Sequence, residues 1–220
     1  MGWPNADELA AEQRRLAEAT WTPWRPVGHY RVGACFACFE QREPGPGLIG
    51  DRGWAAAAVE DLVAVSEGVA PAPYVAGQLA LREGPLLEEA VRALPVLPDV
   101  LIVVATGRDH PRRCGLALQL GAVLAVATVG VTHRPLRAHG EWPEEQRGSA
   151  TALVLRGEHV GYWLRTRPGA RPLAVHAAWR TGPETAVEVV LGVTGRSRTL
   201  EPLRIARAAA RRARSGAAVS

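Results

Sequence analysis

The stretch "LIVVATGRDHPRRCGLALQL", residues 101–120, decides the fold. It begins with five consecutive apolar residues, which predict a buried strand, and passes through Gly107 into a cluster of charged side chains. An apolar helix is predicted at 114–124, directly after this cluster. Because open α/β sheets bind ligands at the carboxyl ends of their strands, the cluster marks the expected functional edge of the sheet. The strand itself contains no carboxylate that would hold a metal at that edge.

The composition is that of an ordinary globular domain. The chain has 220 residues, of which 47% are hydrophobic and 22% charged, and this length is enough to bury a substantial core. No apolar run reaches the roughly 18 residues needed to span a bilayer, and the first residues lack the order of a signal peptide. We therefore expect a cytoplasmic protein without a membrane partner.

All 26 basic residues are arginine, and the formal net charge is +4. This usage is typical of a GC-rich bacterial genome. Each fixed cation is consequently a planar donor that suits an oxyanion better than a lysine would. The charge is compatible with an anionic ligand and does not by itself indicate nucleic acid.

The three cysteines favour a reducing compartment over a disulfide framework. Cys35 and Cys38 are three residues apart in a predicted strand, so their side chains face opposite ways, and Cys114 is the only other thiol. A structural zinc site needs four ligands, which excludes one here. Cys35 is interpreted either as a core residue or as a thiol lining a pocket.

The order of predicted elements indicates an α/β protein. A helix capped by Asn5 precedes three strands that form an antiparallel meander, and helices alternate with strands after it. The strands are predicted at about 29–40, 53–62, 63–70, 101–105 and 125–132, with further strands over 151–166 that are interrupted at Gly157. The helices are predicted at 6–20, 85–94, 114–124, 183–192 and 201–213. This order predicts a ribonuclease H-like three-layer fold, with a central mixed β-sheet flanked by helices.

We expect a single domain over residues 1–220. Its parts would be an N-terminal helix with a Trp/Pro-rich extension (1–28), a core (29–213) and a frayed tail (214–220). The extension includes "TWTPWRPVGHY", residues 20–30, which is either a surface for a protein partner or a cover for one end of the core.

Three segments resemble the signature motifs of one family. They are "PYVAGQLALREGP" (73–85), "LIVVATGRDHPRRCGLALQLGAVLAVATVGVTHRPL" (101–136) and "AVHAAWRTGPETAVEVVL" (174–191), and in this order they resemble endonuclease V. The resemblance covers about residues 29–213. It implies a ribonuclease H-like fold, and an activity in which Mg²⁺ assists the cleavage of nucleic acid near deoxyinosine.

The resemblance also implies which positions would hold the metal. The family's first-strand aspartate aligns with Cys35, its R-E-G-P glutamate is kept as Glu83, and its second strand-end aspartate aligns with Val104. Mg²⁺ prefers hard oxygen ligands, which neither Cys35 nor Val104 provides. Glu83 alone does not forbid metal binding, yet we expect no metal, no other cofactor and no metal-dependent nuclease activity.

Other family positions are partly kept. The tyrosine of the family's strand-separating wedge is Tyr74, but the second proline of that motif is Ala76. The family's lysine aligns with His133, and its histidine aligns with Trp179.

The loss of acidic residues with retention of cations suggests an oxyanion site. Our preferred hypothesis is a metal-independent lyase or cyclase of specialised, natural-product metabolism. Its substrate would be an anionic small molecule that loses sulfate or phosphate. One such reaction is displacement of that group by an amine of the same molecule, which closes a small nitrogen ring. Its candidate catalytic residues are Glu83, His110 and His133. The candidate substrate- and anion-binding residues are Tyr74, Arg108, Arg112, Arg113, His176 and Cys35. The structural alternative is that one of Arg112 and Arg113 pairs with a surface carboxylate.

The second hypothesis is a catalytically silent nucleic-acid-binding protein or a non-catalytic subunit. A nucleic-acid binder should keep a basic track and the stacking wedge. Because the wedge is incomplete, the sequence analysis does not favour nucleic acid as the partner.

Overall fold

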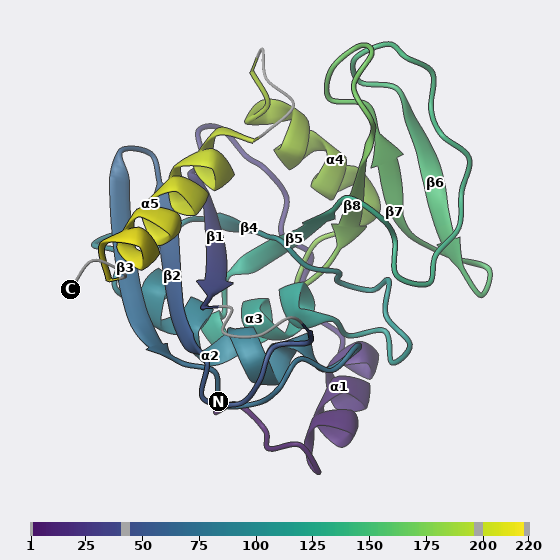
Figure 1. The fold of residues 1–220 in the computed structure, drawn as a ribbon. Helices are drawn as coiled ribbons and strands as arrows, with labels where there is room; N and C mark the ends of the chain where they lie inside the picture. The colour runs from purple at the N-terminus through teal and green to yellow at the C-terminus, as the bar shows by residue number, and fades with distance from the viewer. Residues whose placement is uncertain (1, 41–44, 196–199, 218–220) are drawn as a thin grey trace.

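The computed structural model describes residues 2–40, 45–195 and 200–217, and a central β-sheet organises them (Figure 1). The sheet has eight strands in the order β3-β2-β1-β4-β5-β8-β7-β6. Their bounds are β1 Val32–Phe39, β2 Arg52–Val59, β3 Leu62–Val69, β4 Val100–Val103, β5 Ala127–Thr132, β6 Ala150–Leu155, β7 Glu158–Leu164 and β8 Leu173–Ala177. The pairs β1·β4 and β4·β5 are parallel and the other pairs are antiparallel, so the sheet is mixed.

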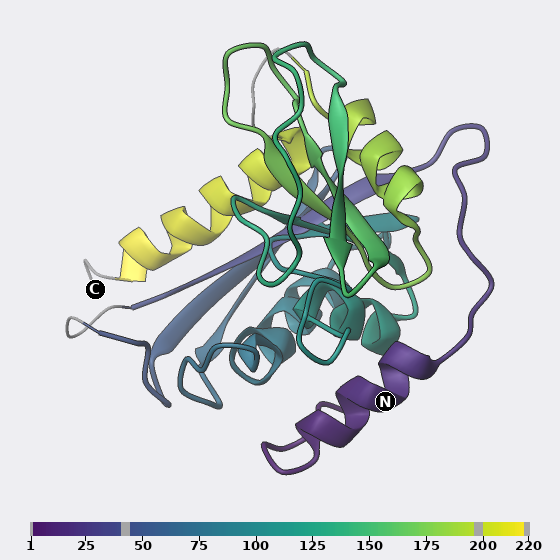
Figure 2. The same cartoon turned by 90° about the vertical axis from the view of Figure 1, so that its right-hand side faces the viewer.

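Helices cover both faces of the sheet (Figures 1 and 2). They are α1 Leu9–Glu18, α2 Leu79–Arg92, α3 Leu116–Leu124, α4 Pro183–Gly192 and α5 Glu201–Ala217. One buried apolar cluster joins α1, α2 and α3 to the sheet, and a second cluster on the opposite face joins α4 and the start of α5 to it. Successive strand residues point to opposite faces, so Leu101 belongs to the first cluster and Ile102 to the second. The three-layer α/β prediction is confirmed.

The loop after β4 is held unusually close to its neighbours. A Cβ at Gly107 would lie 2.1 Å from the carbonyl oxygen of Ala177, and one at Gly115 would lie 2.2 Å from that of Thr106. Only glycine permits such an approach, which explains why the charged cluster of 108–113 lies between two glycines. The loop therefore lies tightly at the carboxyl edge of β4, as expected for the functional edge.

Most predicted elements are present, with shifted ends. The helix predicted from Pro85 begins at Leu79, because Pro85 is accommodated inside α2 rather than at its start. Helix α5 continues to Ala217, past residue 214 where we expected the chain to fray, and 218–220 lie outside the described residues. Asn5 Oδ1 accepts the backbone N–H of Asp7 and Glu8, and the Glu8 side chain accepts that of Asn5. These bonds lie in the turn before α1, which begins at Leu9 with Glu8 as its N-cap, so the cap predicted at Asn5 is displaced by one turn.

The N-terminal extension packs on its own chain. Trp3 Nε1 donates to Glu88 of α2 at 2.7 Å, and the Trp21 ring lies 4.6 Å from the Trp179 ring. The backbone N–H of Trp24 donates to the Arg180 carbonyl at 2.7 Å. Of the two interpretations of residues 20–30, the cover for one end of the core is thus the one that these contacts support. No helix among the described residues has the length and apolar composition that a bilayer would require.

Candidate functional site

The positions aligned with the family's metal ligands meet at the carboxyl edge of the parallel strands. Cys35 lies in β1 opposite Val103 of β4, and Val104 follows as the first residue after that strand. Glu83 approaches from α2, close enough for its charge to contribute to the raised pKa of the Cys35 thiol. The three positions are therefore neighbours, as the resemblance implies.

The chemistry of these positions does not fit a magnesium site. Cys35 is only 1% exposed, and burial raises the pKa of its thiol far above the usual value. Burial also raises the pKa of Glu83 to about 7, while the adjacent Arg82 opposes the shift. Val104 has no donor atom, and the described residues contain no group of three or more His, Cys, Asp or Glu that could hold a metal. A hard divalent cation would find one carboxylate here.

A larger pocket opens beside these positions, and we call it the Tyr74 pocket. It has a volume of about 330 Å³, within the range of small-molecule sites. It is lined by residues 74–77, 79–80, 104–106, 115–116 and 134–136, together with Gln13, His110 and Thr132. Its walls are mostly apolar, and the side chain of Tyr74 is half exposed at its rim. An apolar slot with a few convergent polar groups and an aromatic rim suits a flat, polar-edged ring.

His110 supports the Tyr74 pocket rather than acting as an acid or base. Its Nε2 lies 3.1 Å from the Gly77 carbonyl, and its Nδ1 accepts the backbone N–H of Arg112 at 3.2 Å. These partners fix the neutral tautomer with the proton on Nε2. Burial is the main cause that lowers the pKa of His110 to about 4. Both ring nitrogens thus have protein partners, and the catalytic role of His110 stays a prediction.

His176 is also structural. It is fully buried, its Nε2 lies 2.8 Å from Thr132 Oγ1, and its Nδ1 lies 3.8 Å from Asp109. The Asp109 carboxylate accepts the backbone N–H groups of residues 136, 137 and 138 at 2.6–2.8 Å, which fixes the loop that closes one side of the Tyr74 pocket. His176 is therefore enclosed by protein groups, and its anion-binding role stays a prediction.

The two buried histidines predict a loss of stability in acid. Burial lowers the pKa of both His110 and His176 from 6.5 to about 4, so the folded protein keeps them neutral while the unfolded chain takes up protons below pH 6.5. Their contribution is present in full above pH 6.5 and is lost as the pH falls towards 4. It amounts to about 3 kcal/mol for each histidine at most. Urea unfolding between pH 7 and pH 4 measures it.

The matched comparison for this pH effect uses His176→Gln and the exposed His139→Asn. Between pH 6.5 and pH 4, the free energy of unfolding of His176→Gln should fall less steeply than that of the unchanged protein. His139→Asn should follow the unchanged protein. Parallel curves for His176→Gln and the unchanged protein would contradict the assignment.

The arginines of the 108–113 cluster hold the protein together. Arg108 Nη1 donates to the Ala17 carbonyl at 3.3 Å, and its guanidinium lies over the Trp21 ring. Arg112 donates to Gln13 Oε1 and to the Gly77 carbonyl. Arg113 forms an ion pair with Glu158, as the structural alternative for one of the two arginines requires. These three cations thus connect α1, the Gly77 loop and β7, and their role in binding an oxyanion stays a prediction.

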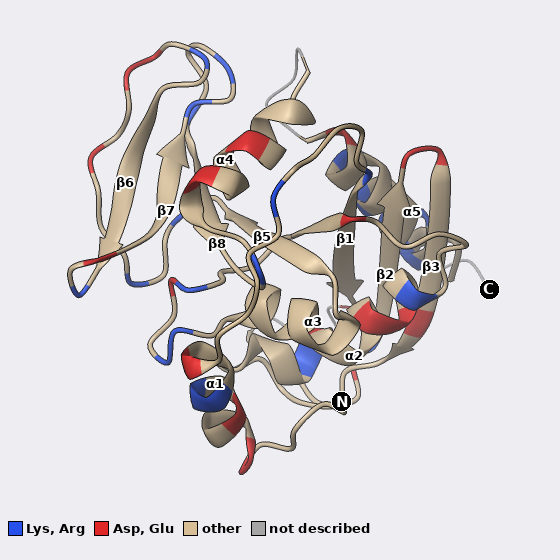
Figure 3. Ribbon diagram, turned by 180° about the vertical axis from the view of Figure 1, so that it is seen from behind, with Lys and Arg blue, Asp and Glu red and all other residues tan. Residues whose placement is uncertain are grey.

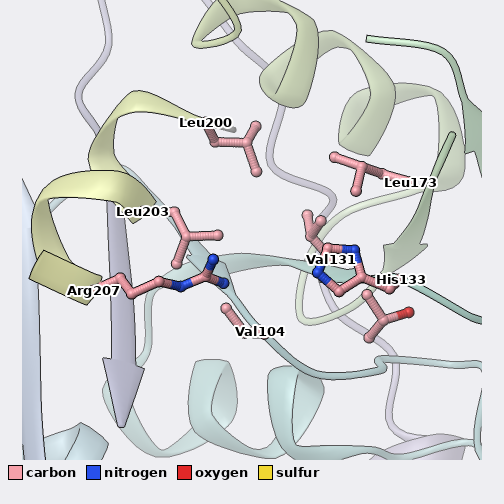
Figure 4. A pocket seen from close by; sticks show the side chains of 8 residues that line it. Val104, Val131, His133, Leu173, Leu200, Leu203 and Arg207 are labelled. Carbon is pink, nitrogen blue, oxygen red and sulfur yellow. The ribbon is translucent and has the colours of Figure 1, made fainter. Parts of the chain in front are cut away.

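A second, smaller pocket shares Val104 and Thr132 with the Tyr74 pocket (Figure 4). We call it the Arg207 pocket, and its volume is about 40 Å³. Its lining residues are Val104, Val131, Thr132, His133, Leu173, Leu200, Leu203 and Arg207. His133, predicted as catalytic, is exposed at this pocket and does not line the Tyr74 pocket. Arg207 was not predicted, because its helix reads as a solvated basic face.

Charge is unevenly distributed around the site (Figure 3). Helix α4 carries acidic residues and no basic ones, and α1 carries both signs. Helix α5 has the sequence EPLRIARAAARRARSGA, which contains five arginines and one glutamate. A polyanion would therefore be attracted to the α5 side of the carboxyl edge and repelled from α4.

Comparison with known proteins identifies the family. The family model described as Endonuclease V matches residues 55–208. The chain belongs to the endonuclease V family. It is 34% identical to endonuclease V of Streptomyces coelicolor over 99% of this chain and 94% of that protein. The crystal structure of endonuclease V from Streptomyces avermitilis superposes with a TM-score of 0.87 at 33% identity, covering 99% and 96% of the two chains.

Other relatives match over less of their length or share less sequence. Endonuclease V of Roseiflexus sp. is 41% identical over 63% of this chain, which spans 62% of that relative's length. Endonuclease V of Ciona intestinalis, solved in complex with DNA containing an inosine, has a TM-score of 0.78 at 18% identity and covers 96% and 98% of the chains. That likeness shows the shared fold.

These findings correct the functional hypotheses. The predicted lyase or cyclase of specialised metabolism is wrong, because relatives across nearly the whole chain are endonuclease V proteins. The preference for an anionic small molecule over nucleic acid is wrong for the same reason, and so is the hypothesis of a non-nuclease role.

Proposed function

We propose that this protein acts on inosine-containing nucleic acid and binds one unpaired base in the Tyr74 pocket. The observation that carries the proposal is this pocket, which lies at the carboxyl edge of the sheet in a member of the endonuclease V family. The Ciona intestinalis relative, whose structure contains DNA with an inosine, supports the choice of ligand.

The lining of the pocket suits an extruded base. Proteins that act on a base within a strand take it out of the stack, hold it between apolar or aromatic side chains, and read its polar edge by hydrogen bonds. Leu79, Ala80 and Leu116 provide apolar walls, and Thr106 provides a hydroxyl. Tyr74 at the rim is placed to stack on the neighbouring base that remains in the strand.

We also propose that the metal centre of this protein has lost two carboxylates, at Cys35 and Val104. Glu83 remains as the single carboxylate there. Cleavage that depends on Mg²⁺ is therefore expected to be slow, since one carboxylate and the substrate would have to hold the ion between them.

Oligonucleotide binding tests the function. A fluorescent single-stranded DNA with one inosine should bind more tightly than the same strand with adenosine, in buffer containing Mg²⁺ and in buffer containing EDTA. Tyr74→Ala should weaken binding of the inosine strand about tenfold, because the loss of one base–aromatic stack costs roughly 1–3 kcal/mol. Fluorescence anisotropy measures both effects.

The matched control is Tyr162→Ala, which removes a tyrosine that contacts Glu184 and does not line the Tyr74 pocket. It should bind the inosine strand as the unchanged protein does. Equal affinity for the inosine and adenosine strands would reject the proposed function, and no effect of Tyr74→Ala would reject the stacking role of Tyr74.

A further inference from the structure

The Arg207 pocket and the Tyr74 pocket share a wall. Val104 and Thr132 line both, and the two pockets have no other lining residue in common. The Arg207 pocket is formed where β5 ends, where β8 begins and where α5 begins. A nucleotide whose base lies in one pocket consequently places its backbone near the other.

Arg207 carries a donor that nothing in the described chain satisfies. Its Nε is buried and has no hydrogen-bond partner among the described residues, and its guanidinium lies 5.0 Å from the Phe36 ring centre. Burial and the neighbouring Arg211 lower the pKa of Arg207, and no described carboxylate forms an ion pair with it. A buried donor without an acceptor is costly, and an arginine remains charged, so this position favours an incoming anion.

The surroundings of Arg207 would strengthen a bond to an anion. Five of the eight lining side chains are aliphatic: Val104, Val131, Leu173, Leu200 and Leu203. A charge-assisted hydrogen bond is stronger in such a low-dielectric setting than in water. The opening is also narrow. Its volume of about 40 Å³ is room for about three water molecules, which suits the oxygens of one tetrahedral oxyanion and excludes a base.

Val104 explains why an anion can be received directly. A carboxylate at position 104 would neutralise Arg207 and repel a phosphate, whereas valine leaves the guanidinium as the fixed charge at this point of the edge. His133 lines the same small pocket from the end of β5 and brings two ring nitrogens to its mouth (Figure 4). The donors at this pocket therefore come from a cation and an imidazole, in the place where the family resemblance would put a metal ligand.

We propose that the Arg207 pocket binds a backbone phosphate of the nucleic acid directly, through Arg207 and His133. The proposal rests on the proposed function, because the base in the Tyr74 pocket is what brings that phosphate into reach. The site is a metal-free phosphate contact, distinct from the arginines of 108–113, which are occupied by protein groups.

Neutral backbone linkages test this contact. A short single-stranded DNA with one inosine is prepared with a methylphosphonate in place of one phosphate at a time. When the methylphosphonate replaces one particular phosphate beside the inosine, the affinity of the unchanged protein should fall about tenfold. Arg207→Met, which keeps the apolar stem over Phe36, should weaken binding of the all-phosphate strand about tenfold and show no further loss at that linkage. The slope of the logarithm of the binding constant against the logarithm of the salt concentration should also become shallower, by the amount expected for about one phosphate contact.

The matched control is Arg204→Met on the preceding turn of α5, where Arg204 is exposed and paired with Glu201. It should keep the sensitivity to the neutral linkage. Arg207→Lys should recover part of the affinity, and thermal unfolding of each variant establishes that it folds.

The outcomes separate the two proposals. The phosphate contact is wrong if Arg207→Met loses affinity at every neutral linkage as the unchanged protein does. It is also wrong if inorganic phosphate competes with the DNA but no single neutral linkage weakens binding. In both cases the preference for inosine stands. If the unchanged protein does not prefer the inosine strand, the proposed function fails, and the phosphate contact fails with it.

Discussion

Mg²⁺-dependent cleavage of inosine-containing DNA should increase about 100-fold when Cys35 and Val104 are replaced by aspartate and Arg207 by alanine. The two aspartates would join Glu83 at the carboxyl end of β4, where Cys35 of β1 pairs with Val103 and Val104 follows the strand. Three carboxylates form a hard-oxygen site that Mg²⁺ can occupy, and a bound metal stabilises phosphoryl transfer by several kcal/mol. Single-turnover cleavage of an end-labelled strand measures the rate, and calorimetry measures Mg²⁺ binding.

The role of Arg207 in that result is tested by leaving it in place. Val104 and Arg207 line the same pocket, so a carboxylate at position 104 would pair with the guanidinium instead of the metal. The variant with only Cys35→Asp and Val104→Asp should therefore gain less activity than the triple variant. Adding Glu83→Gln to the triple variant should remove the gain. A triple variant that folds, binds Mg²⁺ and cleaves no faster than the unchanged protein would show that more than these ligands is missing.

Asp109→Asn should lower the free energy of unfolding by about 3 kcal/mol. The carboxylate of Asp109 is fully buried and accepts three backbone N–H groups from residues 136–138. An amide of the same shape has one acceptor oxygen and directs its NH₂ group at donors, so at least one buried N–H loses its partner. Urea unfolding at pH 7 measures the loss.

The same change should also weaken discrimination of inosine, because Leu136 lines the Tyr74 pocket and its backbone N–H donates to Asp109. The control is Asp99→Asn, an exposed carboxylate that accepts the backbone N–H of Arg31. Its cost should stay below about 1 kcal/mol. Equal costs for the two substitutions would show that the Asp109 bonds do not hold the loop.

The fold could be predicted from local patterns. Apolar runs, turn residues and helical spacing predict the strands and helices, because each depends on neighbours in the sequence. The turn between β6 and β7 is an example, since Arg156 and Gly157 both have positive φ angles, as a tight hairpin requires. The start of α2 was missed because a proline usually marks a first helical turn, and only the packing of α2 on the sheet shows that Pro85 is tolerated inside it.

The site could be predicted only in part, because partners of charged side chains are far apart in the sequence. Arg112 bonds Gln13, 99 residues away, and Arg108 bonds the carbonyl of Ala17, 91 residues away. Without those partners the cluster resembles an anion site. Arg207 was missed for the opposite reason: helix α5 is rich in arginine, and only the pocket lining and the buried Nε of Arg207, unpartnered among the described residues, show which one faces inward.

Because Val104 and Thr132 line both pockets, the two proposed contacts together would make the protein bind an intact nucleotide more tightly than a free base or a free phosphate. A free base or a free phosphate can fill only one of the two pockets, and each must lose its own freedom of motion to do so. When a sugar joins them, binding at one pocket delivers the other group at high effective concentration. Binding of the base in the Tyr74 pocket and binding of the phosphate in the Arg207 pocket would therefore be thermodynamically coupled.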